Sequence, residues 1–240
     1  MSGGYCVHKD PGEYIKSMIQ FEKASLASVL QVGERIAPAR GNQDQYCIVR
    51  SGWIGLFSHR QDGARHLLRL VLPGEMFWLR ACDLAWVLQS AEALTPASCS
   101  RLGQAEARAL FRSDPSQMDL YAATLERELS LSYDSMVNLG RRDAPVQVMH
   151  FLVSLAMRST GRDILQTLEA CRIPLTQRTI GEALGLTQIH VNRTIRHLRS
   201  EGLLTFQGGT FLPLDPDRIG EMIDLTPEKR ALWLARLPVS

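Results

Sequence analysis

The residues whose types and spacing suggest a defined chemistry lie between Gln188 and Ser200. At about 100° per residue along a helix, Ile189, Arg193 and Arg196 point away from an apolar stripe at helical spacing. The stripe consists of Val191, Ile195 and Leu198. A guanidinium group can donate two hydrogen bonds to the edge of a guanine, and an α-helix fits the major groove. The outer face therefore favours recognition of double-stranded DNA.

Two helices and a tight turn are expected to position this face. Thr176 is an N-cap candidate for the first helix and Thr187 for the second, and Gly185 supplies the turn between them. Ordinary helical hairpins with solvated arginines show the same pattern. Here, however, two short β-prone runs, 203–206 and 210–212, follow around a Gly-Gly turn. The combination predicts a winged helix-turn-helix.

The charge is distributed in a way that supports this interpretation. The chain has a net charge of +2, but residues 141–206 hold nine arginines against five acidic residues, a net +4 that leaves −2 elsewhere. A positive field at a candidate DNA-binding unit is the expected electrostatic signature of nucleic-acid binding.

The N-terminal half has the pattern of a β-rich domain. With 240 residues, of which 45% are hydrophobic, the chain has room for two modest domains. Short β-prone runs at 46–49, 53–57 and 67–72 alternate with turn signals, which predicts a jelly-roll or β-barrel. A metal-dependent cupin enzyme would need clustered His and carboxylate ligands, but only His59 and His66 lie here, without an H-x-H pair. We therefore expect no catalytic activity.

Ser113-Asp114-Pro115 is a predicted helix start, and the segment that follows it up to Leu139 contains no Gly or Pro and joins the two halves. Its apolar positions alternate spacings of four and three, which predicts a coiled-coil seam and hence a homodimer. The alternative is a single amphipathic helix packed on its own β-roll. The predicted seam residues are Met118, Ala122, Leu125, Leu129, Ser132, Met136 and Leu139.

The expected fold is α+β with three parts. Residues 1–112 form an N-terminal docking helix, starting near Asp10, and a jelly-roll, cupin-like β-roll. Residues 113–140 form the dimerisation helix, and residues 141–240 form the winged helix-turn-helix domain. Residues 140–143, after the dimerisation helix, are expected to form the hinge between the two domains. Asp143 is expected to cap the helix that follows the hinge, and Thr226 a final short helix beyond the wing.

This order of elements resembles the Crp/Fnr family of bacterial transcription regulators. The matching stretches are Val49-Arg50-Ser51-Gly52, Leu72-Pro73-Gly74-Glu75-Met76-Phe77, Gly140-Arg141-Arg142 with 148–152, and 175–204. The resemblance implies a dimer that presents two recognition helices to successive major grooves of a palindromic site. For an activator it also implies RNA polymerase as a partner.

The resemblance also assigns roles to residues of the two helices. Base-reading positions are Gln188, Ile189, His190, Asn192 and Arg193, and phosphate contacts are expected from Thr176, Gln177, Arg178, Thr187 and Arg196. Arg193 matches the base-reading arginine of the family. Ile189 stands where the family frequently has Glu, and its side chain suits thymine methyl groups instead.

The sequence of the predicted β-roll differs from that of the cyclic-nucleotide-binding members of the family. Their Gly-Glu pair is replaced by Trp78-Leu79, and residues 87–91 contain no arginine to neutralise a cyclic phosphate. We expect no cyclic AMP binding of that type and no cofactor. The alternative is a haem- or redox-sensing regulator whose β-roll binds a cofactor or small effector, with Cys82 as the candidate ligand. Cys6 alone does not provide the clustered cysteines of an iron–sulfur site.

The sequence contains no stretch of about 18 apolar residues and no apolar core of a signal peptide near its start. We therefore expect a cytoplasmic protein without a membrane partner. Its five cysteines are scattered and odd in number, which indicates reduced thiols rather than a disulfide framework.

Overall fold

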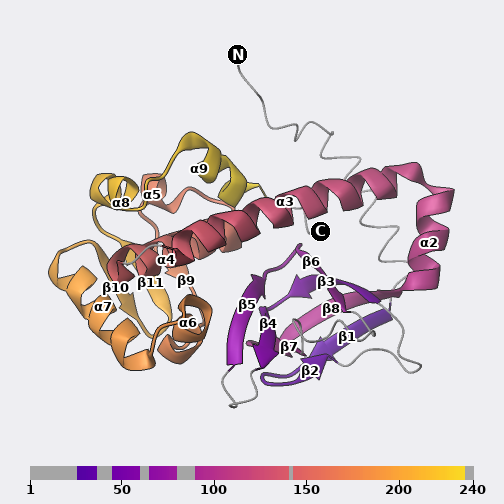
Figure 1. The fold of residues 1–240 in the computed structure, drawn as a ribbon, viewed down its shortest axis with the longest axis horizontal. Helices are drawn as coiled ribbons and strands as arrows, with labels where there is room; N and C mark the ends of the chain where they lie inside the picture. Colours follow the sequence, from indigo (N-terminus) through magenta and orange to yellow (C-terminus); the bar gives the residue numbers. More distant parts are fainter. Residues whose placement is uncertain (1–25, 37–44, 60–64, 80–89, 141–142, 236–240) are drawn as a thin grey trace.

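The computed structural model describes residues 26–36, 45–59, 65–79, 90–140 and 143–235. Two four-stranded antiparallel sheets, ordered β1-β8-β3-β6 and β2-β7-β4-β5, form the N-terminal β-roll (Figure 1). The strands are β1 Leu26–Leu30, β2 Arg35–Ile36, β3 Gln45–Ser51, β4 Ile54–His59, β5 Arg65–Val71, β6 Met76–Leu79, β7 Ser90–Ala93 and β8 Ala97–Gly103. This architecture confirms the predicted jelly-roll.

The three β-prone runs of the sequence lie in β3, β4 and β5, each extended or shifted by one or two residues. Alternating residues of the two sheets face each other and exclude water, with Cys47, Ile54, Val71 and Ala91 fully buried between them. The roll is therefore closed by ordinary apolar packing.

Three helices follow the roll: α2 Gln104–Ser113, α3 Pro115–Leu139 and α4 Ala144–Thr160. Helix α3 begins at Pro115, within two residues of the predicted start at 113, and extends from the roll to the C-terminal domain (Figure 1). The separate helix α2 was not predicted; it follows strand β8 directly, with Gly103 at its N-cap position and no side-chain cap. It packs Ala107 against Ile48 and Leu102 of the roll.

The two faces of α3 differ sharply. Thr124, Leu131 and Asn138, spaced by seven residues, are 2, 7 and 3% exposed and face the protein. All seven predicted seam residues are exposed on another face, where Leu125 and Leu129 keep 49 and 51% of their surface. The inward face accounts for the packing on the same chain, and it leaves Leu125 and Leu129 of the seam about half exposed.

The expectation that Asp143 caps α4 was only half correct. Asp143 occupies the N-cap position, but its side chain accepts no capping hydrogen bond. A capping oxygen normally accepts from the second or third helical N–H, and Pro145 at the second position has no N–H to donate. By contrast, the predicted Thr226 cap is confirmed, because its hydroxyl accepts from the Lys229 N–H.

The C-terminal domain is built around α4 and three short strands. Strands β9 Cys171–Arg172, β10 Leu204–Gln207 and β11 Thr210–Pro213 form one sheet in the order β10-β11-β9. Its remaining helices are α5 Ile164–Thr167, α6 Gln177–Leu184, α7 Gln188–Ser200, α8 Pro216–Met222 and α9 Pro227–Leu234. The winged helix-turn-helix is thus confirmed, and α5, α8 and β9 are additions that the sequence did not predict.

One apolar core crosses the boundary between the two domains. Trp53, Phe57 and Leu67 of the roll belong to the same buried cluster as Leu131 of α3 and the interior of the C-terminal domain. The roll and the DNA-binding domain are therefore packed against each other.

Several predicted features lie outside the described residues. These are the N-terminal docking helix, Cys6, Cys82 and most of the stretch 87–91. Within the described ranges, no helix combines the length and apolar character needed to cross a bilayer.

Candidate nucleic-acid interface

Local hydrogen bonds fix the start of both helices of the helix-turn-helix. The Thr176 hydroxyl accepts from the Thr179 N–H at 3.1 Å, and the Thr187 hydroxyl accepts from the His190 N–H at 3.1 Å. Both predicted N-caps are therefore confirmed. Because each hydroxyl satisfies an otherwise unpaired backbone donor, the caps set the direction in which the helix N-termini point.

Two glycines allow the tight turn between these helices. Gly185 ends α6 in the left-handed conformation, at φ 67°. A Cβ atom at Gly181 would lie 2.4 Å from the Leu186 carbonyl oxygen, a distance at which the backbone would have to move. The turn therefore brings α7 across α6 more closely than another residue at Gly181 would permit.

The predicted inner and outer faces of α7 are both present. Val191, Ile195 and Leu198 are at most 2% exposed. Ile189 is 81% exposed, which is unusual for a large apolar side chain, and Gln188, Arg193 and Arg196 are also exposed. Neither arginine of the outer face pairs with a carboxylate among the described residues, so their charges face solvent.

One predicted base-reading residue contacts a predicted phosphate-binding residue. The Asn192 amide nitrogen donates to the Gln177 side-chain oxygen at 2.8 Å, which joins α7 to the first turn of α6. This bond uses the carbonyl of Gln177 and leaves its NH2 group to donate elsewhere. His190 is half-buried beside it.

Arg178, another predicted phosphate contact, belongs to an ion-pair chain that reaches the roll. Its guanidinium donates to Glu182 at 3.2 Å, and Arg65 of β5 donates to the same carboxylate oxygen at 3.1 Å. Arg65 also bonds Glu92 at 3.0 Å and lies over the Phe57 ring at 4.1 Å. No local sequence pattern indicates the contact between Arg65 and Glu182, because these two residues are 117 positions apart.

The wing, which is the hairpin of β10 and β11, is held against helix α7. Arg199 near the end of α7 donates to the Phe206 carbonyl at 3.0 Å. Gly208 and Gly209, at φ 59° and 76°, form the two-residue turn between β10 and β11. The hairpin is thus held at the C-terminal end of α7.

A buried charge cluster joins the roll, α3 and α4 behind this surface. Glu75, 4% exposed, accepts from Arg158 at 2.8 Å and from the Leu72 N–H at 3.1 Å, and lies 3.3 Å from Arg127. Arg69 lies 3.8 Å away and pairs with Glu128. Burial alone would raise the pKa of Glu75, but Arg158, Arg127 and Arg69 outweigh it and hold that pKa at about 2.

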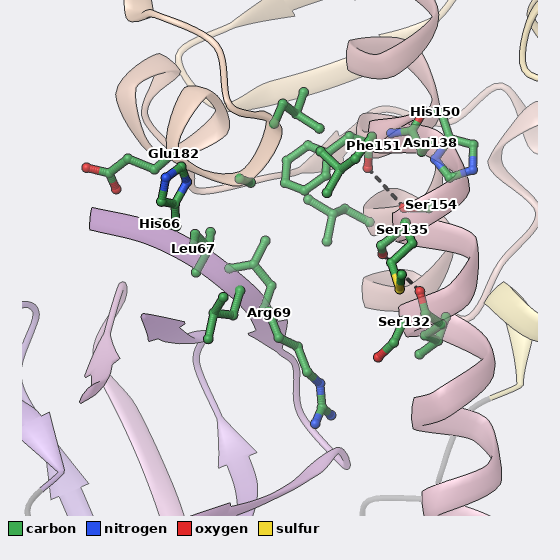
Figure 2. A pocket seen from close by; sticks show the side chains of 18 of the residues that line it. His66, Leu67, Arg69, Ser132, Ser135, Asn138, His150, Phe151, Ser154 and Glu182 are labelled. Atoms are coloured by element: carbon green, nitrogen blue, oxygen red, sulfur yellow. Dashed lines mark hydrogen bonds between the residues drawn. The ribbon is translucent and has the colours of Figure 1, made fainter. Parts of the chain in front are cut away.

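A cavity of about 430 Å³ lies where β5, α3, α4 and α6 meet. Figure 2 shows His66 and Glu182 at one end, Arg69 at the other, and Ser132, Ser135 and Ser154 along the helical wall. The cavity therefore separates the hinge side of α3 and α4 from the roll.

The described cysteines do not provide a reactive thiol. Cys47, Cys99 and Cys171 are buried. Burial raises the pKa of all three thiols, that of Cys171 to about 11, so they stay protonated at neutral pH. Among the described residues, no group of three or more His, Cys, Asp or Glu side chains is arranged to hold a metal ion.

Comparisons with known proteins agree with this architecture. Residues 29–114 match the family model of the cyclic nucleotide-binding domain, and residues 146–222 match that of the Crp-like helix-turn-helix domain. The nitrogen fixation regulation protein FixK of Bradyrhizobium diazoefficiens is 26% identical over 200 residues, covering 83% of both chains. The transcriptional activator protein FnrA of Stutzerimonas stutzeri is 26% identical over 70% of this chain and 68% of its own.

A solved structure shows the same fold. FixK2 from Bradyrhizobium japonicum superposes with a TM-score of 0.66 and 24% identity, covering 82% of this chain and 96% of its own. The two matched family models together span more than half of the chain and occur in the order of this fold. The chain therefore belongs to the Crp/Fnr family of DNA-binding transcription regulators.

Proposed function

We propose that the protein binds a two-fold-symmetric DNA site as a homodimer, with one α7 helix in each of two successive major grooves. The observation that carries this proposal is the exposed outer face of α7, on which a solvated Ile189 stands beside Arg193 and Arg196. The exposed apolar seam of α3 supports the dimer, because Leu125 and Leu129 face water in the single chain.

The test is selection of binding sites from random duplex DNA by the purified protein at a stated salt concentration. We expect a motif with two related half-sites about one helical turn apart, centre to centre. A motif with a single half-site, or no enriched sequence, would contradict the proposal.

Base-reading and phosphate-contacting residues should respond differently to substitution. Arg193→Ala is expected to weaken binding to the selected site by about 1–3 kcal/mol and to relax discrimination at one base pair, since a bidentate guanine contact is lost. Gln177→Ala and Arg178→Ala should weaken binding to all sequences alike. Binding titrations on the selected site and on single-base variants measure both effects. If Arg193→Ala kept its full specific affinity, the assignment of α7 would be wrong.

We further propose that the β-roll does not bind cyclic AMP in the manner of the cyclic-nucleotide-dependent members. Trp78 occupies the position of the glycine that precedes their ribose-binding glutamate, and its ring stacks on Tyr46 with centroids 5.6 Å apart. A buried phosphate without a paired cation would be strongly disfavoured. Isothermal titration should detect no micromolar affinity for cyclic AMP, and a micromolar dissociation constant would overturn this prediction.

As an activator, the protein would also contact RNA polymerase; the regulator FnrA, a relative, is named a transcriptional activator.

A further inference from the structure

We propose that helix α9 is a strap that fixes the angle between α3 and the DNA-binding domain, with Trp233 as a positioning residue for the simultaneous binding of two half-sites. This inference rests on the proposed function, because the angle matters when two recognition helices must match one DNA duplex. Helix α9 lies beyond the residues matched by the helix-turn-helix family model, which end at 222.

Trp233 connects three helices. Its side chain is fully buried, and its indole N–H donates to one oxygen of Asp134, on α3, at 2.9 Å. The other oxygen of Asp134 lies 3.1 Å from Nε2 of His150, on α4. The rings of His150 and Trp233 pack edge to face, with centroids 4.9 Å apart and planes at 89°. A single buried side chain thus contacts both helices that meet at the hinge.

Further contacts attach α9 on both sides of the hinge. After its last turn, the Ala235 carbonyl accepts from Arg127 of α3 at 2.8 Å. On the other side, Arg230 pairs with Asp163, which caps α5 of the DNA-binding domain. Figure 1 shows α9 on the side of α3 away from α6 and α7. The helix therefore spans the hinge from outside.

On the side of the hinge opposite α9, a cavity interrupts the packing between the roll and the DNA-binding domain. His150, which contacts Trp233, also lines the 430 Å³ cavity together with Ser135 and Asn138 (Figure 2). A buried indole with a satisfied N–H resists a change in the angle between the two helices that it contacts. Trp233 therefore helps to fix this angle from the α9 side, in addition to the Arg65–Glu182 bridge between the roll and α6.

The consequence for DNA binding is geometric. A fixed angle holds the second recognition helix at high effective concentration over a half-site at one spacing and excludes it from others. One extra base pair rotates the second half-site by about a tenth of a turn. Loosening the strap should therefore reduce the preference for one spacing and leave the reading of each half-site intact.

The first experiment measures the angle without DNA. Paired spin labels on unnatural amino acids at the exposed positions Glu126 of α3 and Ser200 of α7 report their separation, with labelled protein diluted in unlabelled protein. We expect a narrow distance distribution in the wild type and a broad one in Trp233→Ala. Glu228→Ala, an exposed position on the same helix, is the matched control and should leave the distribution narrow. An unchanged width in a folded Trp233→Ala protein would overturn the inference.

The second experiment compares two operators whose half-site spacing differs by one base pair. In Trp233→Ala the ratio of the two affinities is expected to fall about tenfold, while discrimination between bases within a half-site stays at the wild-type level. Equal loss of affinity for both operators would indicate a purely structural role and contradict the inference. If the wild type bound no two-fold-symmetric site, the proposed function would be wrong. The distance measurement would then still show whether α9 fixes the angle between α3 and the DNA-binding domain.

Milder variants keep the inference testable if Trp233→Ala does not fold. Trp233→Phe retains an aromatic ring but loses the N–H donor, and Asp134→Asn weakens its acceptor. Both are expected to broaden the distance distribution, with Trp233→Phe closer to the wild type than Trp233→Ala. Wild-type distributions and spacing ratios in both folded variants would overturn the inference.

Discussion

Replacing Leu125 and Leu129 together by lysine is expected to yield monomers and to weaken binding to the two-half-site operator by about 10²–10⁴-fold. Both leucines are about half exposed in the single chain and lie one turn apart on the outer face of α3. Lysine ammonium groups at these positions would repel each other across a two-fold seam and would lose their hydration if the seam closed.

The measurement combines sedimentation with binding titrations. Analytical ultracentrifugation reports the mass of the particle, and titration of a single half-site shows whether each α7 still recognises DNA. Ala123→Lys, exposed on the same helix outside the seam, is the matched control and should remain dimeric. A stable dimer in the Leu125→Lys, Leu129→Lys protein would place the dimer contact on another surface.

Glu75→Gln is expected to lower the free energy of unfolding by about 3–5 kcal/mol at neutral pH. Glu75 lies within 4 Å of Arg69, Arg127 and Arg158. Its neutral replacement leaves three buried guanidinium groups facing a single remaining carboxylate, Glu128. Because the cluster joins the roll, α3 and α4, the loss would affect the whole chain rather than one domain.

Urea unfolding of both proteins measures this difference, and its pH dependence provides a second check. The pKa of Glu75 in the folded state lies below that of an ordinary glutamate, so its stabilisation is complete above that ordinary value. It is lost as the pH falls towards about 2, and the two proteins should converge there. Glu169→Gln is the control, because the Arg162–Glu169 pair is 65 and 53% exposed and should contribute less than about 1 kcal/mol. Equal stability of Glu75→Gln and wild type at pH 7 would contradict the prediction.

Features with a local cause were predictable from the sequence. Thr176 and Thr187 precede helices whose first free N–H groups need acceptors, and Gly185 ends α6 in a conformation that glycine adopts easily. The apolar stripe of α7 follows from its helical period, and the wing follows from the Gly-Gly turn between β-prone runs. None of these signals spans more than ten residues, so no knowledge of the tertiary structure is needed.

Features that depend on contacts between residues far apart in the sequence were not predictable. Strand β9 has two residues, and its strand character depends on pairing with Thr210 and Phe211 of β11. The hydrogen bond between Asn192 and Gln177, and the bridge from Arg65 to Glu182, depend on how helices and domains pack. The same holds for Glu75. It lies in the Leu72-Pro73-Gly74-Glu75 motif of the sequence, but its three arginine partners come from separate elements. The spacing of apolar residues shows on which face of a helix or strand a residue lies, but it does not show which residue it contacts.

The apolar core that continues from the roll into the DNA-binding domain has a consequence for the evolution of this protein. Trp53, Phe57 and Leu67 would be exposed to water if the second half were removed. A chimera that joins this roll to the DNA-binding domain of another regulator would bring together two surfaces that were never selected to fit. Inheritance of the two halves as one unit, with compensating substitutions across their boundary, is therefore favoured over exchange of whole domains.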